Sequence, residues 1–128
     1  MKRLLLIFWQ CPQLIIGLFL CLFFRYWKTE KINGIDIEFR ETKFRFCFSL
    51  GKYVFAPKCA PKFVLMHEAG HSVQSVYTGL FYLIVVGIPS ISLYLFKRLR
   101  KKDAVWYHSR YPENWADRIS NIKLDTWK

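Results

Sequence analysis

Three features of the sequence predict an α+β fold: an apolar N-terminal run, a stretch of alternating apolar and charged residues, and two histidines spaced by four. They indicate, in that order, a membrane helix, a small β-hairpin or meander, and a helix whose two imidazoles share one face. The chain has 128 residues, enough for one domain of ordinary size. We therefore expect an anchor segment over residues 1–28 and one folded domain over residues 29–128.

The composition combines many apolar residues with a strong positive charge. Apolar residues make up 53% of the chain and aromatic residues 19%, and the formal net charge is +11. Aromatic rings and basic side chains are both typical of proteins that contact lipid headgroups. Nucleic acid also attracts basic proteins, but no recognition motif accompanies the charge. We therefore expect a lipid bilayer as a partner and no nucleic acid.

The N-terminal run, Leu4–Phe24, is a window of 21 residues without a charge, long enough to cross a bilayer. Pro12 and its neighbouring amides interrupt the window, so we expect a kinked helix. An uncleaved anchor is the favoured interpretation, and a cleaved signal peptide is the alternative. Six basic residues at positions 25–45, against two before Leu4, predict a membrane protein whose C-terminal domain faces the cytoplasm.

Residues 35–55 have the period of β-structure. Isoleucine and phenylalanine alternate with charged residues over 35–39, and phenylalanine occupies every second position over 44–48. Alternation of this kind predicts two strands that pair as a β-hairpin with one apolar face. A short third strand over residues 53–55 is expected after the turn at Gly51.

The helix that carries the histidine pair is expected over residues 61–77. Pro61 suits a first helical turn, and Gly79 lies just beyond the expected end. His67 and His71 leave the same face of this helix. Gly70 lowers helix stability in the middle, which indicates a closely packed neighbour at that position.

Residues 80–96 form a second charge-free stretch of 17 residues, with Gly87–Ser90 at its centre. A single membrane crossing would carry the following chain away from the histidines. We therefore expect two short helices in a hairpin broken at Gly87–Ser90. A last helix is expected over residues 112–121, where Glu113 and Asp117 share one face.

The motifs at residues 67–71 and 113–117 together predict a metal site. Two imidazoles and one carboxylate, here His67, His71 and Glu113, are the ligand set of a hydrolytic zinc ion. Glu68 follows the first ligand and would act as general base toward the attacking water. Asp117 would accept a hydrogen bond from the second nitrogen of a ligating histidine. We therefore expect one zinc ion as cofactor.

His108 has two candidate roles near this site. It is the rival third ligand, since three histidines also form a hydrolytic zinc site. Alternatively it donates a hydrogen bond to a tetrahedral intermediate, and we predict this catalytic role for it beside Glu68. Tyr107, Arg110 and Tyr111 are alternatives for the same role.

The two motifs resemble those of a known family. Residues 67–71 (His-Glu-Ala-Gly-His) with residues 113–117 (Glu-Asn-Trp-Ala-Asp) resemble the gluzincin metallopeptidases, most closely the membrane-bound HtpX-like and CAAX-prenyl endopeptidases. The wider block over residues 60–117 also looks like small bacterial membrane proteins. The resemblance implies a zincin-like helical core and the same three zinc ligands, with Glu68 as base and Asp117 behind a histidine.

Three functional hypotheses follow from these patterns. The first is a membrane-associated zinc metalloendopeptidase that hydrolyses a peptide or protein substrate. The second is a non-catalytic membrane protein in which the metal only ties the 61–77 helix to the last helix. The third is a basic amphipathic membrane binder without a metal. Glu68 favours the first, because a purely structural site needs no carboxylate beside the metal.

Overall fold

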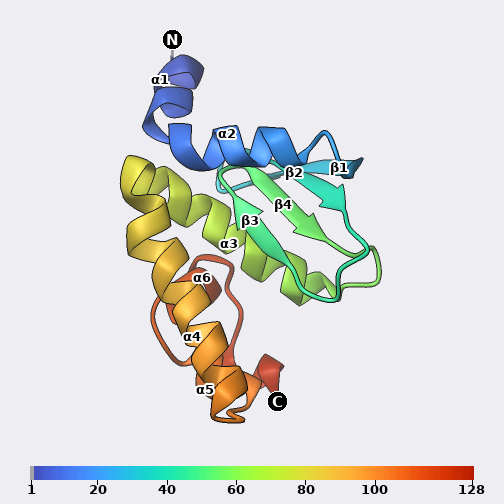
Figure 1. Cartoon of the computed structure of the whole chain (residues 1–128), viewed down its shortest axis with the longest axis vertical. Helices are drawn as coiled ribbons and strands as arrows, with labels where there is room; N and C mark the ends of the chain where they lie inside the picture. Colours follow the sequence, from blue (N-terminus) through green and yellow to red (C-terminus); the bar gives the residue numbers. More distant parts are fainter. Residues whose placement is uncertain (1) are drawn as a thin grey trace.

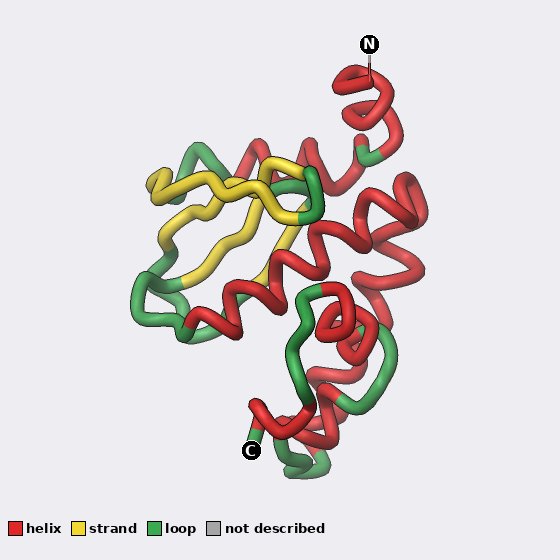
Figure 2. The backbone as a smooth tube through the Cα atoms, turned by 180° about the vertical axis from the view of Figure 1, so that it is seen from behind, coloured by secondary structure: helices red, strands yellow, loops and turns green. Residues whose placement is uncertain are grey.

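The computed structural model describes residues 2–128 and has six α-helices and one mixed four-stranded sheet within that range. The chain is therefore α+β, as the sequence predicts. The helices α2 (Cys11–Leu20) and α3 (Lys62–Thr78) both pack against the sheet. Beyond α3, three further helices lie together (Figures 1 and 2): α4 (Ile88–Leu99), α5 (Ala104–His108) and α6 (Glu113–Ile119).

The N-terminal run is two helices, α1 (Lys2–Trp9) and α2 (Cys11–Leu20), bent by 88°. The predicted kink is present as a break between two helices, the helical part ends at Leu20 instead of Phe24, and the membrane crossing stays a prediction. The bend occurs where two amides find partners on α3: Gln13 Nε2 donates to Ser75 Oγ at 2.9 Å, and Ser75 Oγ donates to Gln10 Oε1 at 2.7 Å. Among the described residues no single helix is long and apolar enough to span a membrane, and only the bent pair meets that test of length and composition.

The sheet contains β1 (Arg25–Ile32), β2 (Ile35–Glu41), β3 (Phe48–Leu50) and β4 (Tyr53–Ala56) in the order β1-β2-β4-β3. The outer pairs β1–β2 and β3–β4 are antiparallel, and the central pair β2–β4 is parallel. Ordered β-structure thus begins at Arg25, inside the segment that the sequence assigned to the anchor.

The predicted hairpin, in which residues 35–39 pair with residues 44–48, is wrong. The strand β2 pairs with β1 instead of residues 44–48, of which only Phe48 belongs to a strand. The cause is a two-residue turn at Asn33 and Gly34, which both have positive φ (51° and 77°). An Asn-Gly pair in this conformation closes a tight hairpin between the strands on either side of it.

The helix α3 (Lys62–Thr78) covers the range expected for the histidine helix and ends at Gly79, whose φ is 56°. One of its faces packs on the sheet and forms the main core cluster: Ile37, Phe39, Val54, Ala56, Leu65 and Ala69. The opposite face contacts α6 (Glu113–Ile119). At Gly70 an added Cβ would lie 2.5 Å from the carbonyl oxygen of Ala116, so the glycine permits this close contact.

The apolar stretch is one helical segment that runs back past α3, and the predicted break at Gly87–Ser90 is wrong. A π-helical turn (Leu83–Gly87) continues directly into α4 (Ile88–Leu99), and Gly87 keeps helical angles. Pro89 lacks an N–H for the Val85 carbonyl, but the hydroxyl of Tyr111 donates to that oxygen at 2.8 Å. The chain reverses before the segment, at Gly79, and after it, before α5 (Ala104–His108).

Two glycine substitutions should change stability in opposite directions. Gly70→Ala should destabilise the protein by about 1–3 kcal/mol, because its Cβ would collide with the α6 backbone. Gly87→Ala should stabilise it by about 0.5–1 kcal/mol, because the position is helical and the nearest atom to a new Cβ is 3.8 Å away. Thermal unfolding followed by circular dichroism measures both. Equal shifts of the two melting temperatures would contradict the close α3–α6 contact.

Candidate metal centre

Two helices bring the predicted ligands together. The helix α3 presents His67 and His71, and Glu113 at the start of α6 lies between them. Glu113 Oε2 is 2.8 Å from His67 Nε2 and 3.0 Å from His71 Nε2. All three residues are buried, and the ligand atoms lie within 4.8 Å of one another. The group can therefore hold a metal ion.

The outward nitrogen of each imidazole has a hydrogen-bond partner. His67 Nδ1 donates to Asp117 Oδ1 at 2.7 Å, the contact expected from the sequence. His71 Nδ1 donates to Gln74 Oε1 at 2.6 Å, and Gln74 Nε2 donates to the Pro112 carbonyl at 3.0 Å. These contacts turn both Nε2 atoms toward the Glu113 carboxylate.

Gln74 and Ser90 are members of the site that the sequence hypothesis missed. Gln74 orients His71, and its position seven residues after His67 on the same helical stripe was the available signal. Ser90 Oγ donates to Glu113 Oε1 from α4. No local signal could identify this second contact, because it forms only when α4 folds back over α3.

His108 lies behind His67 and away from the cavity. Its Nδ1 is 3.3 Å from Asp117 Oδ2 in a geometry that forms no hydrogen bond, and its ring stacks on Trp127 with centroids 3.4 Å apart. His108 belongs to a second buried group, with His67 and Asp117, that could also hold a metal ion, and it does not join His71 and Glu113. The structure therefore does not place His108 where either of its predicted roles requires it.

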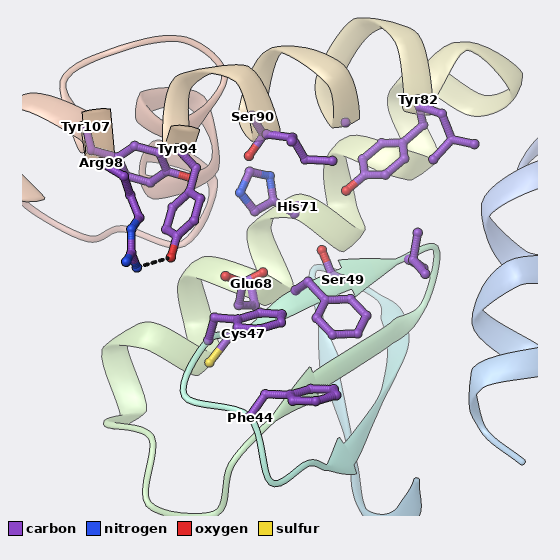
Figure 3. A pocket seen from close by; sticks show the side chains of 16 residues that line it. Phe44, Cys47, Ser49, Glu68, His71, Tyr82, Ser90, Tyr94, Arg98 and Tyr107 are labelled. Atoms are coloured by element: carbon purple, nitrogen blue, oxygen red, sulfur yellow. Dashed lines mark hydrogen bonds between the residues drawn. The ribbon is translucent and has the colours of Figure 1, made fainter. Parts of the chain in front are cut away.

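A cavity of about 750 Å³ opens beside the cluster. Glu68, His71, Ser90 and Tyr107 are polar residues in its wall, and Figure 3 shows the Glu68 side chain in the cavity below His71. Most of the remaining wall is aromatic or aliphatic: Phe44, Phe46, Phe48, Leu50, Tyr82, Leu83, Ile91 and Tyr94. A predominantly apolar pocket with a few convergent polar groups is the usual form of a ligand site.

The electrostatics of the cluster favour positive charge at its centre. Burial alone would lower the pKa of His67, but hydrogen bonds to Asp117 and Glu113 outweigh burial and raise it to about 10. The pKa of His71 is also raised, because the charge of Glu113 outweighs burial. Burial opposes ionisation of Glu113, but the two imidazoles hold its pKa well below the usual range. A bound cation would take the place of this imidazole charge.

The chain matches no protein family, no curated protein and no solved structure.

Binding of a divalent cation should release protons. The pKa of His67 lies near 10, so this residue is protonated at pH 7.5 and must lose its proton before Nε2 can bind a metal. Metal affinity should therefore increase with pH up to about 10. Titration calorimetry in buffers of different ionisation enthalpy should give about one proton or more released per metal bound. Binding without proton release would contradict the role of His67.

Proposed function

We propose that this protein is a membrane-associated zinc metallopeptidase that hydrolyses peptide bonds. The observation that carries the proposal is the position of Glu68. Its carboxylate lies in the cavity beside His71, next to a buried group of two imidazoles and one carboxylate. A ligand set of this kind together with an adjacent base is what metal-assisted hydrolysis requires.

The donor atoms favour zinc over the other common divalent cations. Two imidazole nitrogens and one carboxylate oxygen suit zinc, whereas magnesium and calcium prefer oxygen ligands alone. Asp117 and Gln74 hold the outer nitrogens of His67 and His71, so each Nε2 would be free for the metal. Glu113 would be the third ligand.

Glu68 is the residue that we assign as general base. A zinc ion bound at the site would polarise the substrate carbonyl and lower the pKa of the attacking water. Glu68 would accept a proton from that water and then donate it to the leaving amine. Burial raises the pKa of Glu68, which strengthens the carboxylate as a base.

We assign stabilisation of the developing negative charge to Tyr107 instead of His108. It lines the cavity, and burial together with the charge of Glu113 raises its pKa, so its hydroxyl stays protonated. A neutral hydroxyl can donate a hydrogen bond to the carbonyl oxygen as charge develops there. Ser90 would have a different task, because its hydroxyl already donates to Glu113 and orients that carboxylate.

The substrate would be a peptide or protein with large apolar side chains, which match the aromatic and aliphatic wall of the cavity. Attachment to a bilayer is supported by the bent pair α1–α2, which exposes many large apolar residues, among them Leu4, Leu5, Ile7, Phe8, Ile15, Leu18 and Phe19. The distribution of basic residues favours a cytoplasmic position for the C-terminal domain.

A metal with a purely structural role is the second candidate function. The contact between α3 and α6 supports it, because Glu113 is fully buried and joins both histidines of α3. Removal of the metal would then unfold the protein, and no substrate would be turned over. The position of Glu68 in the cavity makes the catalytic function the stronger proposal.

Glu68→Gln should abolish hydrolysis and leave zinc in place. The amide cannot accept the proton, so turnover of an internally quenched apolar peptide should fall by about 10²–10⁴-fold. Zinc content per chain should be unchanged, because Glu68 is not a ligand. Glu41→Gln, at the end of β2 and outside both the cavity wall and the histidine cluster, is the matched control and should leave both measurements unchanged. Hydrolysis that survives in Glu68→Gln would refute the mechanism.

The pair Tyr107→Phe and Tyr111→Phe separates catalysis from folding. Loss of the Tyr107 hydroxyl should lower kcat by about 10²-fold without loss of zinc. Loss of the Tyr111 hydroxyl should leave kcat unchanged and cost about 0.5–1.5 kcal/mol of stability, because the Val85 carbonyl loses its hydrogen bond. Steady-state kinetics and thermal unfolding measure the two effects. A similar kcat for both variants would remove Tyr107 from the reaction.

A further inference from the structure

One exposed face of the segment Leu80–Leu99 carries large aliphatic side chains that are solvent-exposed in the fold. Its members recur at intervals of three or four, so they form a continuous row along the helix. Their exposed fractions run from 47% at Leu80 to 81% at Leu99. We call this row the α4 stripe: Leu80, Ile84, Ile88, Ile91, Leu95 and Leu99.

A dense basic cluster follows at the end of the α4 stripe. We define it as Lys97, Arg98, Arg100, Lys101 and Lys102. Within residues 2–128, none of these five side chains forms an ion pair with a carboxylate. The sequence also has no aspartate or glutamate between Glu68 and Asp103. The segment over residues 69–102 therefore carries positive charge without a negatively charged side chain of its own.

Aromatic rings lie among these cations. The charged group of Arg100 is 5.8 Å from the centre of the Phe96 ring, and that of Lys102 is 5.9 Å from the Trp106 ring. Aromatic side chains beside basic ones are typical of the headgroup region of a bilayer, where a ring contacts both apolar and polar surroundings. The end of α4 thus has the composition of an interfacial segment.

From these observations we propose that α4 docks on an anionic lipid bilayer, with the α4 stripe in contact with acyl chains and the basic cluster in contact with headgroups. A helix with one apolar face and cations at its polar boundary lies in the plane of the interface. A second copy of the chain is the less suitable occupant, because the basic clusters of two parallel stripes would repel each other. Anionic headgroups complement the cluster instead.

Docking of α4 has a consequence for the cavity. The residues of α4 and its preceding turn that line the cavity include Leu83, Gly87, Ser90 and Tyr94, each one position before a member of the α4 stripe. Ile91, itself a member of the α4 stripe, and Arg98 of the basic cluster also line the cavity. The docked helix would therefore hold the cavity next to the headgroups. Docking of α4 requires neither a bound metal nor hydrolysis.

A local fluorescent probe tests the docking without interference from other membrane contacts. Leu99→Cys is labelled with an environment-sensitive dye in a Cys59→Ser background, because Cys59 is the one exposed cysteine of the described chain and the other three are partly buried. The labelled full-length protein is mixed with phosphatidylcholine vesicles, or with vesicles that also contain phosphatidylglycerol. Lys123→Cys, an exposed position outside the α4 stripe and the basic cluster, carries the same dye as the matched control.

The proposal predicts a blue shift of the dye at residue 99 with anionic vesicles and no such shift at residue 123. A triple variant that reverses three charges of the basic cluster (Arg100→Glu, Lys101→Glu and Lys102→Glu) should weaken vesicle binding of α4 by about tenfold or more. Leu95→Asp should remove the shift, because it places a charge within the stripe. The shift should persist in a Glu68→Gln variant, so a failure of the proposed hydrolysis would not be mistaken for a failure of docking.

Three results would overturn the proposal. One is the absence of a shift at residue 99 with anionic vesicles. Another is an equal shift at residues 99 and 123, which would mean general adsorption of the protein. The last is a shift that occurs without vesicles and increases with protein concentration, which would identify a second copy of the chain as the occupant of the α4 stripe.

Discussion

The carboxylate of Glu113 is fully buried, and a charge that is removed from water must be matched by an opposite charge or by a metal ion. The imidazoles of His67 and His71 provide that match from α3, at 2.8 and 3.0 Å. This constraint sets the distance between α3 and α6, and Gly70 allows the two backbones to approach closely enough. Asp117, one turn along α6, then meets the outer nitrogen of His67. The contact between the two helices is therefore built around one carboxylate.

The other elements give this contact its surroundings. The sheet packs on the opposite face of α3 through Leu65 and Ala69, and the cavity lies between the phenylalanine-rich segment before β3 and the returning α4. Because α4 runs back over α3, Ser90 reaches Glu113 and the cavity has an apolar wall on each side of Glu68. Folding thus places the Glu113 carboxylate between the two imidazoles and the Glu68 carboxylate in the cavity next to them. That separation is the physical basis for assigning one as a ligand and the other as a base.

Sequence reasoning succeeded where the determining forces are local. The four-residue spacing of His67 and His71, and of Glu113 and Asp117, predicted which side chains share a helix face. It failed where partners lie far apart in the chain. Pro89 suggested a break because nothing nearby shows that Tyr111 would satisfy the Val85 carbonyl, and the stacking of His108 on Trp127 was equally invisible. The β1–β2 hairpin is different, because the Asn-Gly turn at residues 33–34 was a readable signal. The parallel pairing of β2 with β4 had no such signal.

The central claim is that His67, His71 and Glu113 bind one metal ion and that His108 does not. The metal content of the purified wild-type protein, measured beside Glu113→Ala and His108→Ala by mass spectrometry, tests it most directly. We predict about one zinc ion per chain in the wild type and in His108→Ala, and its loss in Glu113→Ala. A wild-type protein without stoichiometric metal, or a His108→Ala variant that loses its metal while Glu113→Ala retains it, would contradict the claim.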